Sequence, residues 1–207
     1  NPVLTLTQLD KIKQSKFNVK HLSTLYQDNL KEALERLGEA AIQATRDGHT
    51  ILVLDDSELI DNDDESKLKE QRYAMPILLA ISHIHQLLIR EGLRMDTSLV
   101  ALSGETREVH HVACLLGYGA NAVIPYLAQH TIAHLTETHR LEGTVSDNVE
   151  TYTRVLSEGV IKVMAKMGIS TVQSYQGAQI FEAVGLSQEV IDDYFTGTQS
   201  KLSGLSI

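Results

Sequence analysis

The stretch SGETREVHHVACLLGYGANAVIPYLA, residues 103–128, decides the fold that we expect for this chain of 207 residues. Its apolar residues recur at the helical spacing i, i+3, i+4 and i+7, at Val109, Val112, Ala113 and Leu116. This spacing predicts a helix that is buried on most sides. Gly117 can end that helix, and AVIPYLA, residues 122–128, reads as the strand that follows it. The stretch therefore combines a strand end, a polar turn, a helix and a second strand.

Three more short apolar runs have the length of buried strands, residues 49–56, 97–102 and 169–174. Helices are expected at residues 24–47, 76–91, 128–140, 148–167, 177–185 and 187–195. Strands that alternate with helices predict an α/β fold with a parallel sheet covered by helices. Four strands are too few to close a barrel, so we expect an open or incomplete β/α-barrel-like domain.

One domain is the expectation for a chain of this length. We divide it into an N-terminal arm and helix, residues 1–47, an α/β core, residues 48–195, and a boundary segment, residues 196–207. Thr7 can cap a short basic helix within the arm, and Asp147 can cap the helix expected at residues 148–167.

Composition argues against several classes of protein. The net charge is −9 and no cluster of Lys and Arg is present, which excludes a typical nucleic-acid surface. No apolar run is long enough to span a membrane, and the start has no signal-peptide pattern, so we expect no membrane partner and a cytoplasmic location. The single cysteine, Cys114, lies in an apolar helix and is expected to be packed and inert.

Metal and dinucleotide motifs are incomplete. An EF-hand loop that starts at Asp61 would need glycine at Ser66 and glutamate at Arg72. His130 and His134 share a helix face, but no third ligand is evident. The G-x-G-x-x-A pattern at residues 117–122 follows a helix, whereas a phosphate-binding turn must precede one. We therefore predict no metal and no cofactor site.

Polar residues gather where the predicted strands end. Ligands and partners of parallel α/β sheets meet that edge, so these residues are candidates for a functional site. The candidate strand-end rim comprises Glu105, Arg107, Glu108, His111, Tyr126, Ser174, Tyr175 and Gln176. One interpretation is that Arg107 neutralises the neighbouring carboxylates and fixes the turn. The other is that the rim faces another domain.

The chain also resembles a known family. Besides residues 103–128, the stretches at 75–100, MPILLAISHIHQLLIREGLRMDTSLV, at 160–186, VIKVMAKMGISTVQSYQGAQIFEAVGL, and at 194–204, YFTGTQSKLSG, resemble the central domain of the glutamate synthase large subunit. That domain lies between a glutaminase domain and a flavin domain. The resemblance implies an α/β layout and covers most of the chain from residue 48 onward.

The resemblance implies a catalytically silent connecting domain within a parent enzyme that makes L-glutamate from L-glutamine and 2-oxoglutarate. The domain would space the glutaminase and FMN domains and help to wall the ammonia route between them. It implies no cofactor in this fragment. FMN and an iron-sulfur cluster belong to the parent, and FAD and NADPH to a partner subunit of the NADPH-dependent type. The partners implied are the neighbouring domains, with the small subunit or ferredoxin reached through the parent.

Two alternatives stay open: a purely structural spacer, and a stand-alone α/β enzyme with Glu105 or His111 as general base.

Some positions depart from the family pattern. Gln176 stands where the family has arginine, Ile124 where it has asparagine, and residues 55–57, DDS, where it has serine-aspartate-arginine. The polar role of those positions is thus open.

Overall fold

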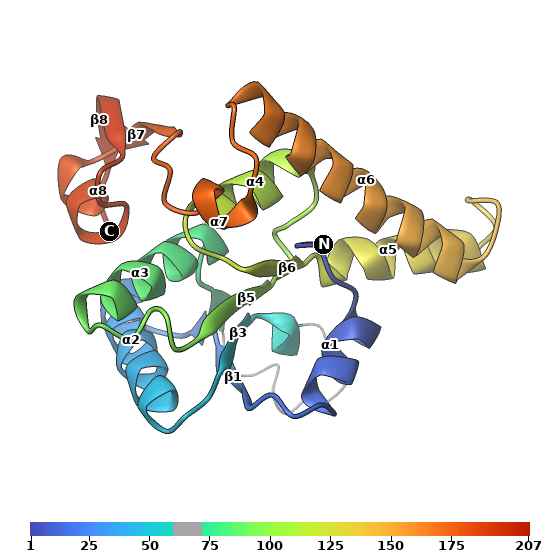
Figure 1. The fold of residues 1–207 in the computed structure, drawn as a ribbon, viewed down its shortest axis with the longest axis horizontal. Coiled ribbons are helices and arrows are strands. Elements are labelled where there is room, and N and C mark those ends of the chain that lie inside the picture. Colours follow the sequence, from blue (N-terminus) through green and yellow to red (C-terminus); the bar gives the residue numbers. More distant parts are fainter. Residues whose placement is uncertain (60–71) are drawn as a thin grey trace.

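A computed structural model describes residues 1–59 and 72–207. Its centre is a parallel sheet in the order β1-β3-β5-β6 (Figure 1). These strands are β1 (Val19–Ser23), β3 (Ile51–Asp55), β5 (Ser98–Leu102) and β6 (Ala122–Ile124). Val3 adds an isolated parallel bridge to Val123. The sheet does not close within the described residues, which confirms the predicted open β/α layout.

One face of the sheet is covered by three helices, α2 (Leu30–Arg46), α3 (Ile77–Arg90) and α4 (Val109–Gly117). Alternate strand residues point to this face, among them Leu52, Leu54, Leu99, Ala101 and Val123. All of these are fully buried, because successive residues of a strand face opposite sides and parallel sheets are covered on both. The larger part of the core lies here.

The opposite face is covered by the short helix α1 (Leu6–Lys13), which Figure 1 shows across the sheet from α2 and α3. Leu9 of α1 packs with four buried strand residues, Val53, Val100, Leu102 and Ile124. The side chain of Thr5 accepts from the amide of Gln8, and the side chain of Gln8 accepts from the amide of Thr5. The predicted cap at Thr7 was therefore wrong by two residues, because this reciprocal capping box starts the helix earlier.

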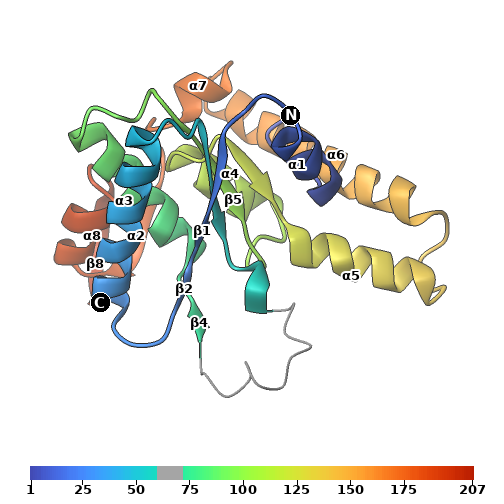
Figure 2. The same cartoon turned by 90° about the horizontal axis from the view of Figure 1, so that it is seen from below.

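Helices α5 (Tyr126–Glu137) and α6 (Val145–Lys166) lie side by side and project beyond the sheet (Figures 1 and 2). The strand predicted at residues 122–128 ends at Ile124, because the chain becomes helical directly after Pro125. Thr144, not Asp147, caps α6 by accepting from the amide of Asp147. The structure thus starts both helices earlier than the sequence patterns predicted.

Two predicted elements were wrong, and the start of a third was placed too early. Residues 169–174 are not a strand: they lead into the short helix α7 (Val172–Tyr175), which Thr171 caps. Residues 177–185 are not a helix, since they enter β7 (Glu182–Leu186), which pairs in parallel with β8 (Gln199–Leu205). The helix predicted from residue 24 begins at Leu30. The fourth strand of the main sheet is instead β1, in the segment predicted as an arm.

Smaller elements complete the described chain. These are β2 (Leu25–Tyr26), which pairs antiparallel with β4 (Tyr73–Ala74), the 3₁₀ turn η1 (Ser57–Leu59), and α8 (Gln188–Tyr194), which confirms the predicted helix at 187–195. No helix among the described residues has the length and apolarity to cross a bilayer. The calcium loop that the sequence argues against at residues 61–72 lies almost wholly outside the described residues.

Substitution Leu9→Ala should lower the free energy of unfolding by about 3 kcal/mol, because it removes the buried side chain through which α1 covers the sheet. Urea titration followed by circular dichroism measures this change. The control is Lys11→Ala, on the exposed side of the same helix, which should change the value by less than about 0.5 kcal/mol. Equal effects of the two substitutions would contradict the assigned role of α1.

Candidate functional site at the carboxyl edge of the sheet

The end of β3 is tied to the end of β5 by the carboxylate of Asp56, which is only 2% exposed. Its Oδ2 accepts from the hydroxyl of Ser103 at 2.9 Å, and its Oδ1 accepts from the amide of Gly104 at 3.0 Å. A buried carboxylate is stable when donors surround it in this way. Asp56 therefore shapes the loop that leads into α4.

Glu105 belongs to the same loop and reaches across to α3. Its amide donates to the hydroxyl of Ser103 at 3.1 Å, and its Oε2 accepts from the amide of Ile77 at 2.9 Å. The N-cap residue of α3 is Pro76, whose side chain makes no capping bond. The carboxylate of Glu105 thus supplies the cap and lies at the positive end of the helix dipole.

His111 and Arg107 are held by backbone groups. The Nδ1 of His111 accepts from the amide of Arg107 at 3.2 Å, and its Nε2 lies 3.6 Å from the Oε1 of Glu108. The carbonyl of Arg107 accepts from the hydroxyl of Tyr152 at 2.8 Å, and burial raises the pKa of Tyr152 to about 12. Within the described residues the Arg107 side chain forms no ion pair with Glu105 or Glu108, so backbone bonds fix this turn.

A hollow of about 390 Å³ opens between the start of α3 and one side of α4. Its lining is Ile77, Leu78, Glu105, Thr106, His110, His111, Cys114 and Leu115. We call it the α3–α4 hollow. Burial raises the pKa of the Cys114 thiol to about 11, so the group is protonated at neutral pH. Its Sγ lies 3.5 Å from the Nε2 of His110. The hollow therefore has apolar walls, a polar rim and no thiolate.

Tyr126 lies at the same edge but under the surface. It belongs to the small core cluster beneath α1, and its ring contacts that of His130 edge-on. A Cβ at Gly104 would come within 3.1 Å of the Tyr126 hydroxyl. A side chain at residue 104 would therefore crowd this tyrosine, and glycine leaves room for the close approach.

The remaining predicted rim residues lie at the opposite edge of the sheet. Gln176 donates through Nε2 to the carbonyl of Ala120 at 2.6 Å, just before β6 begins. Tyr175 is fully buried, and burial raises its pKa to about 12. Ser174 bonds to Thr171. The structure therefore does not bring residues 174–176 to Glu105, because they follow no strand of the main sheet.

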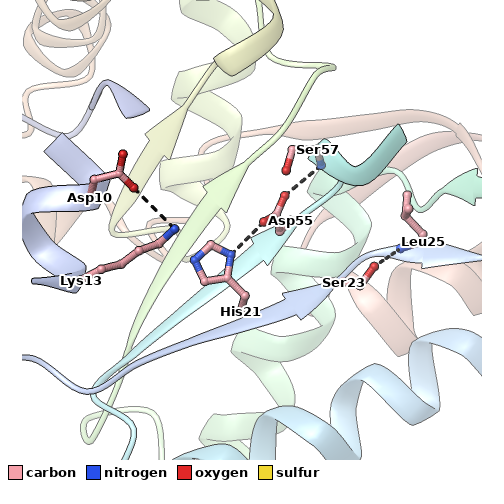
Figure 3. Close-up of polar contacts among 7 residues, drawn as sticks. All are labelled: Asp10, Lys13, His21, Ser23, Leu25, Asp55 and Ser57. Atoms are coloured by element: carbon pink, nitrogen blue, oxygen red, sulfur yellow. Dashed lines mark hydrogen bonds and ion pairs between the residues drawn. The ribbon is translucent and has the colours of Figure 1, made fainter. Parts of the chain in front are cut away.

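A histidine–aspartate pair at the carboxyl edge escaped the sequence analysis (Figure 3). His21 on β1 lies with Nδ1 2.8 Å from the Oδ2 of Asp55, and the amide of Ser57 donates to Oδ1 at 2.8 Å. Burial alone would raise the pKa of Asp55, but the bonds from His21 and Ser57 outweigh it and lower that pKa. The carboxylate is thus ionised and can only accept, so the Nδ1 of His21 is the donor of this bond. The signal was missed because β1 was not predicted.

The amino edge holds a second unpredicted network, around Arg94. Its guanidinium donates to the Nδ1 of His85 at 2.8 Å, to the carbonyls of Thr97 and Gly119 at 2.7 and 2.8 Å, and to the Oδ1 of Asn121 at 3.0 Å. Burial, and then the charge of Arg94, lower the pKa of His85 to about 4. His85 is therefore a neutral acceptor at neutral pH.

Among residues 1–59 and 72–207, no three His, Cys, Asp or Glu side chains are grouped to hold a metal ion. His130 and His134 both lie exposed on α5. The groups gathered at the carboxyl edge are instead bonded to one another and to the backbone.

The open parallel sheet with helices on its larger face is the layout of a partial β/α barrel. The family model described as "Glutamate synthase central domain" matches residues 1–187. The chain therefore belongs to the glutamate synthase central domain family.

Similar proteins agree with this family. The chain is 46% identical to the glutamate synthase [NADPH] large chain of Bacillus subtilis over 90% of its own length and 12% of that protein. It is 40% identical to ferredoxin-dependent glutamate synthase 1 of Arabidopsis thaliana over 100% of its length and 13% of that protein. The chain thus spans about an eighth of these relatives.

Solved structures agree on the fold. A flavocytochrome b2 mutant with benzoylformate matches with a TM-score of 0.57 and 13% identity, over 96% of this chain and 46% of that chain. The flavin-binding domain of baker's yeast flavocytochrome b2 matches with a TM-score of 0.54 and 14% identity, over 99% of this chain and 46% of that one. At such identity the likeness shows the fold alone.

Substitution Asp56→Asn should lower the free energy of unfolding by about 1–3 kcal/mol, because an amide cannot accept both bonds without turning a donor toward Gly104 or Ser103. Hydrogen exchange of the Gly104 amide should become faster by the corresponding factor. Asp28→Asn, at an exposed position, is the control and should leave that exchange rate unchanged.

Stability should fall as the pH drops from about 6.5 to about 4, because the unfolded chain then takes up a proton that folded His85 resists. The slope from this residue is at most about 1.4 kcal/mol per pH unit. His85→Asn retains an acceptor for Arg94 and should flatten that part of the slope, measured by urea unfolding at each pH. Burial also lowers the pKa of His83, so some slope should persist. Identical slopes in both proteins would exclude this role of His85.

Proposed function

We propose that this chain is the connecting domain of a glutamate synthase, a parent enzyme that makes L-glutamate from L-glutamine and 2-oxoglutarate. The domain spaces the glutaminase and FMN domains of the same polypeptide and does no bond-making itself. Membership of the central domain family and the small share of its relatives that the chain spans support this proposal. The division of the chain into residues 1–47, 48–195 and 196–207 is part of this proposal.

The observation that carries the proposal is how the candidate bases are engaged. Glu105 accepts from the amide of Ile77, and the Nδ1 of His111 accepts from the amide of Arg107. A general base needs a free lone pair within reach of a substrate proton. The Nδ1 of His111 and one carboxylate oxygen of Glu105 are thus engaged with backbone amides, and this engagement favours a structural role over the alternative of a stand-alone enzyme.

The cofactors follow from the same proposal. FMN and an iron-sulfur cluster belong to the parent outside these residues, and FAD and NADPH to a partner subunit where the donor is NADPH. This fragment holds none of them. The small subunit or ferredoxin meets the parent, and this chain takes part only through its neighbouring domains.

The α3–α4 hollow is the part of the surface that we assign to the ammonia route. Its walls are mainly apolar, with Ile77, Leu78 and Leu115, and its thiol is uncharged. Ammonia must travel as the neutral molecule to remain a nucleophile, and an apolar wall favours the neutral form over ammonium because burying a charge is costly. The rim residues Glu105 and His111 mark the polar end of the hollow.

The substitution His110→Trp in the full-length parent should uncouple glutamine hydrolysis from glutamate formation, because the larger ring fills the hollow without removing a backbone anchor. The measurement is the ratio of glutamine hydrolysed to 2-oxoglutarate consumed, which is one in the coupled reaction and should rise at least twofold. His110 is preferable to Glu105, which caps α3, and to Tyr126, which is buried.

The matched control is His134→Trp, at an exposed position on α5 outside the hollow. It should leave the ratio unchanged. An unchanged ratio with both substitutions would leave a purely structural spacer as the function of the domain. Glutamate formation by this 207-residue chain alone would contradict the connecting role altogether.

A further inference from the structure

The parallel pair β7–β8 carries an exposed apolar surface. Val184 is 73% exposed, Leu202 63% and Leu205 76%. Val184 and Leu202 are direct neighbours across the two strands, and Leu205 pairs with Leu186. We call Val184, Leu202 and Leu205 the ribbon patch. Figure 1 shows this pair at the C-terminal end of the chain, apart from the main sheet.

This surface is fixed in place. The amide of Ser187 donates to the carbonyl of Leu205 at 2.8 Å, and the hydroxyls of Tyr118 and Thr198 lie 2.8 Å apart. The adjoining helix α8 buries Val190 and Ile191, and Leu186 packs against the main core. The ribbon is therefore anchored to α8 and to the main core, while the side chains of the ribbon patch remain exposed.

Such an arrangement is incomplete by itself. Parallel strands are normally covered on both faces, and an isolated two-stranded sheet is only marginally stable in water. Val184 and Leu202 are paired, and Leu205 lies farther along the same ribbon, so the ribbon leaves large aliphatic side chains exposed to water. The physical expectation is that another apolar surface covers them.

The charges of the ribbon favour an apolar partner. Lys201 and Glu182 bond to each other, with Nζ 3.1 Å from both carboxylate oxygens. Their charges cancel beside the patch, so the ribbon presents no net charge to attract a charged segment or an anionic surface. The contact must then come mainly from buried apolar area.

The relatives point to the source of that surface. The Arabidopsis enzyme matches the whole of this chain, β8 included, as a small share of a much longer polypeptide. We propose that the ribbon patch is the docking surface for an apolar face of another domain of the same polypeptide. This inference rests on the proposed connecting function and specifies where one of the neighbours binds.

Photo-crosslinking in the full-length polypeptide tests this assignment. Benzoylphenylalanine placed at Leu205, and in a second variant at Val184, should on irradiation crosslink to peptides from outside residues 1–207 of the same polypeptide. Mass spectrometry identifies these peptides, and the product should keep the mass of a single chain. The control position is Ile161 on α6, which is 63% exposed but lies away from the ribbon. Its yield should be at least fivefold lower.

Crosslinks confined to residues 1–207, a product of doubled mass, capture of a different protein, or equal yields at Leu205 and Ile161 would each overturn the assignment. The measurement requires no turnover. A docked ribbon together with unchanged coupling in His110→Trp would reject the ammonia route while the docking surface stands. Altered coupling in His110→Trp without crosslinks from Leu205 or Val184 would reject the docking surface and leave the ammonia route standing.

Discussion

The buried carboxylate of Asp56 is the contact on which the carboxyl edge depends. It joins the end of β3 to the loop after β5, and through Ser103 it places Glu105 at the start of α3. Three elements are thereby held by two carboxylates, the hydroxyl of Ser103 and backbone amides, and among the described residues no arginine or lysine takes part. Such bonds are directional, so they fix the loop more precisely than a surface ion pair would.

The second constraint is the need to cover both faces of a parallel sheet. Three helices cover the larger face, whereas α1, from the beginning of the chain, covers the face that a closed barrel would enclose. Val3 adds to this by pairing beside β6, so the start of the chain closes the edge that later strands leave open. Within the described residues, both faces of the open sheet are therefore covered.

Secondary structure could be predicted from the sequence where an element is buried along most of its length. β3 and β5 are continuous apolar runs, and α4 keeps its helical spacing, so all three could be predicted. β1 reads VKHLS, an edge strand with polar residues, and its partner lies about thirty residues away. α7 was mistaken for a strand because it is short and β-branched at its start. The placement of Gln176 depends on Ala120, a contact between distant segments that no local pattern encodes.

The two edges of the sheet differ in which surfaces remain accessible to a ligand or to another domain. At the amino edge, Arg94 directs four bonds inward, and burial together with the charge of Arg94 lowers the pKa of His85 so that it is a neutral acceptor. At the carboxyl edge the carboxylates are likewise engaged, and what remains accessible is the mainly apolar α3–α4 hollow. The ribbon patch is accessible and apolar as well. At both edges, therefore, several charged groups hold loops of the domain itself, while the α3–α4 hollow and the ribbon patch leave apolar side chains accessible.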